Sequence, residues 1–199
     1  MTQSHINDCK DKNMKISKSR FSIRVTAATG ILGALMLAFS YMESVVTALL
    51  PLPPGVKPGI ANIIVMFACA SMGFGCALLL TLIKSAFAVI VSGITAGFIS
   101  LSGGLLSVAV TALLIKRAYG RLSFTGISVL GAVCHNAGQT VAACIILGSP
   151  YYAAYFPVLV ISAVITGAVT GTVLNCIMPS LKKLGLFNKL KSEKRNTEE

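Results

Sequence analysis

Long apolar runs, interrupted by short polar or Pro-rich segments, make up most of the chain. They extend over about residues 25–50, 60–115, 124–147 and 153–178. A helix that crosses a membrane needs about 20 predominantly apolar residues. The run over 60–115 therefore suits three spans, and each of the others suits one. The pattern predicts an all-α integral membrane protein, a single bundle of six transmembrane helices.

Breaks between the spans are predicted where residues disfavour helix. The connector over 51–59 contains four prolines, which exclude a continuous helix there. Within the long run, small and turn-forming residues gather at 71–75 and at 93–104, so the helices are expected to change there. Polar, basic tails flank the bundle. The predicted organisation is a tail over 1–24, a six-helix transmembrane domain over 25–180 and a tail over 181–199.

Charge supports the membrane assignment and predicts its direction. Between residues 12 and 192 the only acidic side chain is Glu43, although the net charge of the chain is +11. Lys and Arg gather over 10–24, 116–121 and 182–195. Six spans place all three basic segments on one side, which the positive-inside rule identifies as the cytoplasm. We interpret these segments as topology determinants and contacts with anionic lipid of the bilayer, and we expect no nucleic-acid binding.

Small residues recur every four positions on three of the predicted helices. Such stripes let helix backbones approach closely in lipid. Packing within the bundle explains at least two of them, and one is free to meet a partner protein. The stripes are Gly30, Ala34 and Ala38; Gly103, Ser107 and Thr111; and Ala163, Gly167 and Gly171.

Polar side chains inside the apolar body are costly in a membrane and are therefore functional candidates. At about 1.5 Å per residue, Lys84 and His135 are both about 15 Å from the cytoplasmic side, so they can line one cavity. Glu43 is expected near the outer interface, with no acid at the depth of Lys84, which favours an anionic or hydrogen-bonding ligand over a metal cation. The candidate ligand-binding residues are Glu43, Lys57, Asn62, Lys84, Ser107, His135, Asn136 and Gln139.

Structural roles compete with binding for several of these residues. Lys84 can snorkel toward the interface or form a buried pair. His135, Asn136 and Gln139 share a helix face and can hydrogen-bond between helices. Glu43 can form a salt bridge with Lys57. These alternatives stay open at the level of the sequence.

Motifs of the common enzyme classes are missing from the sequence. No G-x-x-x-x-G-K-[ST] loop predicts an ATP site, and no G-x-S-x-G elbow predicts a serine nucleophile. The apolar body has no pair of carboxylates, and the cysteines have no zinc-ligand spacing. We therefore expect a binding protein or permease rather than an enzyme, with no catalytic residue, no cofactor and no metal site.

Three sequence blocks resemble a known family. They are Pro53–Asn62, Leu101–Ser107 and Gly131–Gln139, and in this order they resemble the bacterial family labelled heptaprenyl diphosphate synthase component I, also called the Gx transporter family. That family in turn resembles the S components of energy-coupling-factor (ECF) transporters. Those six-helix proteins capture vitamins or their precursors from outside, beneath a cap made largely by the connector after the first helix.

The resemblance implies a function and partners for this chain. It implies an S-component-like subunit in the bacterial cell membrane that takes up a small polar or anionic metabolite. S components dock on a T component through small residues of helix one, which here are Gly30, Ala34 and Ala38, and two ATPases power the cycle. The family label leaves an alternative, a non-catalytic membrane component of heptaprenyl diphosphate or quinone biosynthesis. Prenyl diphosphate synthases use Asp-rich motifs, whereas this chain has only Asp8 and Asp11, in its tail.

Overall fold

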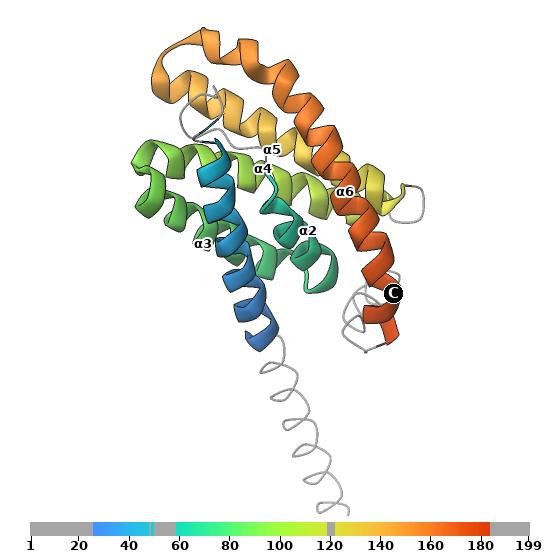
Figure 1. Ribbon diagram of the computed structural model, residues 1–199. Helices are drawn as coiled ribbons and strands as arrows, with labels where there is room; N and C mark the ends of the chain where they lie inside the picture. The colour runs from blue at the N-terminus through green and yellow to red at the C-terminus, as the bar shows by residue number, and fades with distance from the viewer. Residues whose placement is uncertain (1–25, 48, 50–58, 119–121, 184–199) are drawn as a thin grey trace, which may run out of the picture.

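The computed structural model describes residues 26–47, 49, 59–118 and 122–183, with side chains for all of these except 118 and 178–183. Every element of secondary structure with more than one residue in these ranges is helical (Figure 1). The elements are α1 (Thr26–Thr47), α2 (Asn62–Ser71), α3 (Phe74–Ser92), α4 (Ile94–Ala118), α5 (Phe124–Leu147), the 3-10 helix η1 (Pro150–Tyr155) and α6 (Phe156–Lys183).

The prediction of an all-α membrane bundle is confirmed. Five of the six α-helices are long and apolar enough to cross a membrane, namely all except α2. α2 has 10 residues, which at about 1.5 Å per residue cover about half of a hydrocarbon core about 30 Å thick. The second predicted span is therefore a half-length helix, preceded by the non-helical residues 59–61.

Glycines with positive φ mark three of the predicted helix boundaries. Gly73 separates α2 from α3 with φ +95°, and Gly93 separates α3 from α4 with φ +88°. Gly148 ends α5 in the left-handed conformation. α4 continues through Gly103 and Gly104 without a break, so the predicted change of helix at 93–104 occurs at its first residue only.

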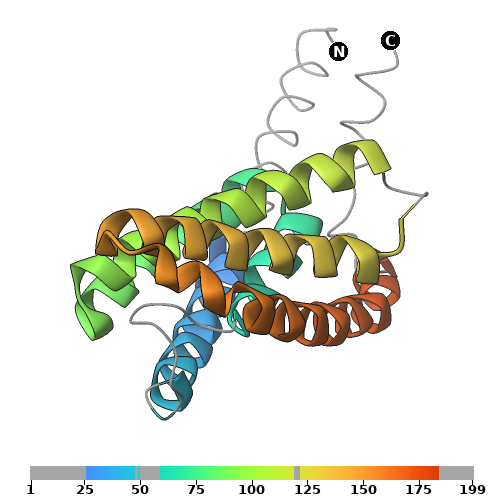
Figure 2. The same cartoon turned by 90° about the horizontal axis from the view of Figure 1, so that it is seen from above.

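Consecutive helices pack in a row, with α4 against α3, α5 against α4 and α6 against α5. α2 contacts all four of them and lies across the row (Figure 1). The view from above shows α5 and α6 running side by side over most of their length (Figure 2). Each helix after α2 reverses direction, so the chain passes back and forth through the bundle.

One end of the bundle collects the ends of the helices that adjoin the basic segments. Near the start of α1, Thr29 donates a hydrogen bond to the sulfur of Met72, between α2 and α3. The end of α4, the start of α5 and the end of α6 meet in one apolar cluster that contains Leu114, Phe124 and Leu174. Lys116 in the last turn of α4 lies at the same end. The helix ends next to all three basic segments therefore share one end of the bundle.

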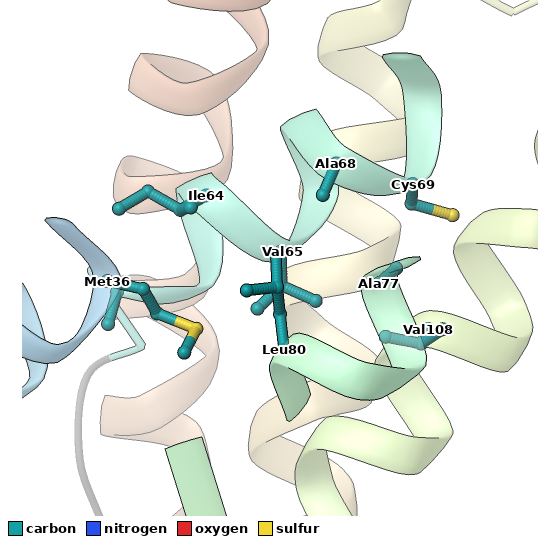
Figure 3. Packing of buried hydrophobic residues seen from close by; sticks show 9 residues of the cluster. Met36, Ile64, Val65, Ala68, Cys69, Ala77, Leu80 and Val108 are labelled. Carbon is teal, nitrogen blue, oxygen red and sulfur yellow. The ribbon is translucent and has the colours of Figure 1, made fainter. Parts of the chain in front are cut away.

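An apolar core surrounds α2. Val65 and Ala68 of α2 pack against Met36 of α1, Leu80 of α3 and Val108 of α4, and all five side chains are buried. Figure 3 shows these side chains converging from four helices. Burial of apolar surface contributes about 25 cal/mol per Å² only when it removes that surface from water. In a bilayer the surrounding medium is lipid, so this contribution is absent. Close packing between the helices therefore holds α2 in place.

Two of the three small-residue stripes are used inside the bundle. A Cβ atom on Gly103 of α4 would lie 2.6 Å from the carbonyl oxygen of His135, and one on Gly167 of α6 would lie 2.6 Å from Cα of Val129. Both glycines thus permit close contact with α5. The stripe of α1 differs, because Gly30, Ala34 and Ala38 are all exposed.

Candidate functional site

The amino end of α2 lies inside the bundle. Gly59 is buried, and its carbonyl oxygen accepts the backbone N–H of Asn62, the first residue of α2, at 3.0 Å. A helix that begins within a membrane leaves backbone N–H groups that need acceptors there. The residue at the N-cap, Ala61, has no side-chain acceptor to give. The N–H groups of Gly59 and Ile60, just before α2, take their acceptor from another helix.

Glu43 of α1 supplies this acceptor. Its Oε1 accepts hydrogen bonds from the backbone N–H groups of Gly59 and Ile60, the second at 3.0 Å. The Glu43 side chain is only 2% exposed. A carboxylate at the amino end of a helix is also stabilised by the positive end of the helix dipole. Glu43 therefore holds the broken second helix in the bundle.

This role differs from the one expected for Glu43. Its position near the outer interface was estimated from distance along a helix perpendicular to the membrane, whereas α1 crosses α3 and α4 at a steep angle (Figure 1). The N–H of Gly59 donates to Glu43, and a Cβ position on Gly59 lies 3.2 Å from the His135 ring, so only one residue separates the acid from the histidine. Lys57, the expected salt-bridge partner and ligand contact, lies outside the described residues.

Gly59 is packed against α5 in a conformation that favours glycine. Its φ is +88°, and a Cβ atom there would lie 3.2 Å from Cδ2 and 3.8 Å from Nε2 of His135. The same Cβ would be 3.8 Å from Oδ1 of Asn136. The sequence predicts Gly59 only as the last residue of the connector over 51–59, which is expected to cover the site from outside. A glycine shortly before a helix was the available indication, because glycine readily adopts the positive φ that a tight turn into the helix requires.

We expect Gly59→Ala to lower the free energy of unfolding by more than the backbone cost of about 1–3 kcal/mol, because its methyl group would also displace His135. Thermal unfolding of the full chain in detergent measures the loss. Gly73→Ala is the matched control, since Gly73 has φ +95° but no heavy atom within 4 Å of its Cβ position. Equal losses at the two glycines would contradict close packing of Gly59 on His135.

The three residues of α5 that the sequence singles out, His135, Asn136 and Gln139, are all buried. His135 and Gln139 lie against Gly103 of α4. The Asn136 amide donates from Nδ2 to the carbonyl oxygen of Leu159 in α6, at 2.7 Å. The expected interhelical hydrogen bond is therefore present for Asn136, and the Leu159 carbonyl is a partner that the sequence did not identify.

A chain of hydrogen bonds joins α2, α4 and α5. Nδ2 of Asn62 donates to Oγ of Ser107 at 3.0 Å, and Oγ of Ser107 donates to the carbonyl oxygen of Gly131 at 2.9 Å. All of these groups are buried. The chain positions Asn62 in the first turn of α2, next to Gly59.

Lys84 of α3 is buried, with 3% of its surface exposed. It therefore does not snorkel to the surface of the bundle. Two adjacent glycines let α4 fit between α3 and α5. A Cβ atom on Gly103 would lie 3.2 Å from the His135 ring of α5, and one on Gly104 would lie 2.5 Å from the Thr81 side chain of α3, so larger residues would be crowded there. Lys84 is one turn beyond Thr81.

Four of the sequence-predicted residues thus lie around the start of α2 and form a polar cluster there: Glu43, Asn62, His135 and Asn136. Five of the six buried side-chain atoms that lack a hydrogen-bond partner among the described residues belong to this cluster. Leaving such a group unpaired costs about 1–3 kcal/mol, so a cluster of them points to a further polar molecule as their partner. The five atoms are Oε2 of Glu43, Oδ1 of Asn62, Nδ1 and Nε2 of His135, and Oδ1 of Asn136.

The arrangement offers charge and hydrogen bonds rather than metal ligands. Among the described residues, no group of three or more His, Cys, Asp or Glu side chains is placed to hold a metal ion. Lys84 and Glu43 bring opposite charges to the cluster, and His135 and the two asparagines bring neutral polar atoms. Such a set can bind and orient a small polar molecule.

The fold and this cluster define an all-helical membrane protein with a buried polar site at a broken helix. A family model described as heptaprenyl diphosphate synthase component I matches residues 32–177. The match covers most of the chain, including α2 to α5 and every described residue of the polar cluster, so the chain belongs to this family. No curated protein and no solved structure matches the chain.

Proposed function

We propose that the chain is the substrate-binding membrane subunit of a transporter, similar to an ECF S component. It takes up a small polar or anionic metabolite or a vitamin-like precursor. The observation that carries the proposal is the polar cluster at the start of α2. Membrane transporters commonly bind their substrates where a discontinuous helix begins or ends within the bilayer, and the break before α2 has unpaired polar atoms around it.

The proposed site assigns a part to each polar residue. Lys84 supplies positive charge for an anionic or electron-rich group of the ligand. His135, Asn136, Asn62 and Gln139 supply hydrogen bonds that fix its orientation. Glu43 holds the start of α2 in place through the N–H groups of Gly59 and Ile60. Ser107 positions Asn62 through its hydrogen bond.

The exposed stripe of α1 supports docking on a T-type subunit. The two other stripes are covered by α5, whereas Gly30, Ala34 and Ala38 are exposed side by side along α1. The opposite face of α1 carries Met36 and Glu43, which are buried in the bundle. A partner helix can thus bind α1 without disturbing the ligand site. Two ATPases bound to that partner would supply the energy.

Topology is the first prediction of this proposal. The shared end of the bundle adjoins all three basic segments, so we expect that end and both termini in the cytoplasm of a bacterial cell membrane. Reporter fusions after residue 119 and after residue 148 test it. We expect cytoplasmic activity at the first position and external activity at the second. The reverse pattern would overturn the orientation.

A second candidate function follows from the description of the family. The chain would then be a non-catalytic membrane component of heptaprenyl diphosphate or quinone biosynthesis, and would hold a polyprenyl lipid in its bundle. A long apolar chain needs an apolar channel, whereas the side chains around Gly59 are polar and buried. The polar cluster therefore favours the transport proposal.

Affinity purification of the tagged full chain from its native membrane separates the two functions. The transport proposal predicts a T-type membrane subunit and ATPases in stoichiometric amounts with the chain. A soluble prenyl diphosphate synthase in their place would reject transport in favour of the biosynthetic role. Genes for these proteins next to the gene of this chain are a cheap first indication of either outcome.

A further inference from the structure

The hydrogen-bond pattern fixes which way the Asn62 amide points. Oγ of Ser107 donates its only hydrogen to the carbonyl oxygen of Gly131, so toward Asn62 the hydroxyl can only accept. The NH₂ group of Asn62 must therefore face Ser107, and its Oδ1 faces away. That oxygen is buried and has no hydrogen-bond partner among the described residues.

The same reasoning fixes the Asn136 amide. Its partner is the carbonyl oxygen of Leu159, which can only accept, so Nδ2 must face Leu159. Oδ1 of Asn136 then points to the side of Gly59, where a Cβ position lies 3.8 Å away. This oxygen too is buried and unpartnered within the described part of the chain.

Glu43 adds a third acceptor. Its Oε1 accepts the N–H groups of Gly59 and Ile60, while Oε2 is buried with no partner among the described residues. Glu43 and Asn136 both lie next to Gly59, and Asn62 follows three residues further along the chain. A neutral His135 offers one N–H and one acceptor. Acceptors therefore outnumber donors here, and a phosphate or carboxylate placed against them would leave them unpaired.

We infer that the ligand presents a nitrogen group rich in N–H donors, such as an amidine, an ammonium group or a ring with N–H edges, to Glu43, Asn62 and Asn136. The inference rests on the proposed function and narrows its ligand class. The group's positive charge or N–H edge matches the Glu43 carboxylate, and charge-assisted hydrogen bonds are the stronger ones. Lys84 then binds an acceptor or anionic group elsewhere on the same molecule, so the ligand is amphoteric.

Acetamidinium and acetate test the inference, because the two ions have the same planar shape and differ in offering N–H donors or oxygen acceptors. Their affinities for the purified full chain in lipid nanodiscs are measured by ligand-observed NMR. We expect acetamidinium to bind at least tenfold more tightly than acetate. No binding of acetamidinium, or equal or tighter binding of acetate, would overturn the inference.

Glu43→Gln locates the effect at the site. The amide oxygen of the glutamine can keep the hydrogen bonds from the N–H groups of Gly59 and Ile60. The NH₂ group of the glutamine then takes the place of Oε2, so the site has a donor where it had an acceptor. We expect acetamidinium affinity to fall at least tenfold. Thr170→Val is the control, since Thr170 is buried and bonds only within α6 in the described structure. This variant should bind acetamidinium with the same affinity as the unaltered chain. An unchanged affinity in Glu43→Gln would reject the inference.

Asn62→Leu provides an independent reading if Glu43→Gln does not fold. It removes another of the three acceptors and leaves the hydrogen bond between Ser107 and Gly131 in place. The same tenfold loss is expected, and no loss would overturn the inference. The binding measurement uses the isolated chain, so it does not depend on other subunits. If the chain does not purify with ATPases, the proposed transport function is rejected, but the measured preference for acetamidinium is unaffected.

Discussion

Replacement of Ala34 by tryptophan is expected to abolish assembly of the chain with a T-type subunit and its ATPases. Ala34 lies at the centre of the exposed stripe of α1, between Gly30 and Ala38. Close contact between membrane helices depends on small residues at the interface, and an indole ring there would hold the partner helix away. Because Ala34 is exposed, the change leaves the packing of the bundle itself intact.

The assembly prediction is measured by co-purification, with Ile165→Trp as the control. Ile165 is an exposed residue of α6, so the same ring is added to a face without a small-residue stripe. We expect at least a tenfold loss of co-purifying subunits in Ala34→Trp and none in Ile165→Trp. Unchanged co-purification in Ala34→Trp would show that the stripe faces lipid only.

Lys84→Met is expected to weaken binding of the small molecule that purifies with the chain by more than tenfold, about 1.4 kcal/mol. Lys84 is buried in the bundle, and in the proposed site an anionic or acceptor group of the ligand would lose its partner. Methionine is unbranched and flexible and fills a similar space. The variant is therefore expected to stay folded.

The Lys84 prediction is measured by titrating the released molecule back onto the stripped chain. Lys116→Met is the control, because Lys116 is exposed in the last turn of α4, at the end of the bundle. It removes the same charge from the chain far from the polar cluster. Equal affinity in Lys84→Met and Lys116→Met would place the ligand away from Lys84.

Sequence patterns predicted the helices well where length and local chemistry decide them. The bounds of α5, Phe124–Leu147, follow from the basic segment before it and the Gly-Ser-Pro turn after it. The burial of Lys84, His135 and Asn136 was also predictable, because polar side chains in a membrane turn inward. Their burial in the structure agrees with that principle.

Features that depend on contacts between distant segments could not be predicted from the sequence. Nothing local to Asn62 indicates that its helix covers only half of the membrane. The break is stabilised by Glu43, more than fifteen positions earlier in the chain. The sequence likewise does not indicate that Glu43 and His135 lie on either side of Gly59, because that arrangement depends on how α1 packs against α2 and α3.

The two internal stripes illustrate the same limit. Gly103 and Gly167 have the same four-residue spacing as Gly30, yet both are covered by α5 while Gly30 is exposed. The spacing predicts that a backbone can come close but does not identify which one. Only the order of packing, with α4 and α6 on either side of α5, separates the internal stripes from the free one.

Native mass spectrometry of the full chain released from lipid nanodiscs tests the central claim most directly, namely that the polar cluster at the start of α2 holds a small polar ligand. The account predicts one bound polar molecule of low mass per chain, present in the unaltered protein and in Lys116→Met and lost in Lys84→Met. A bound polyprenyl lipid, or a small molecule whose occupancy is the same in Lys84→Met, would contradict it.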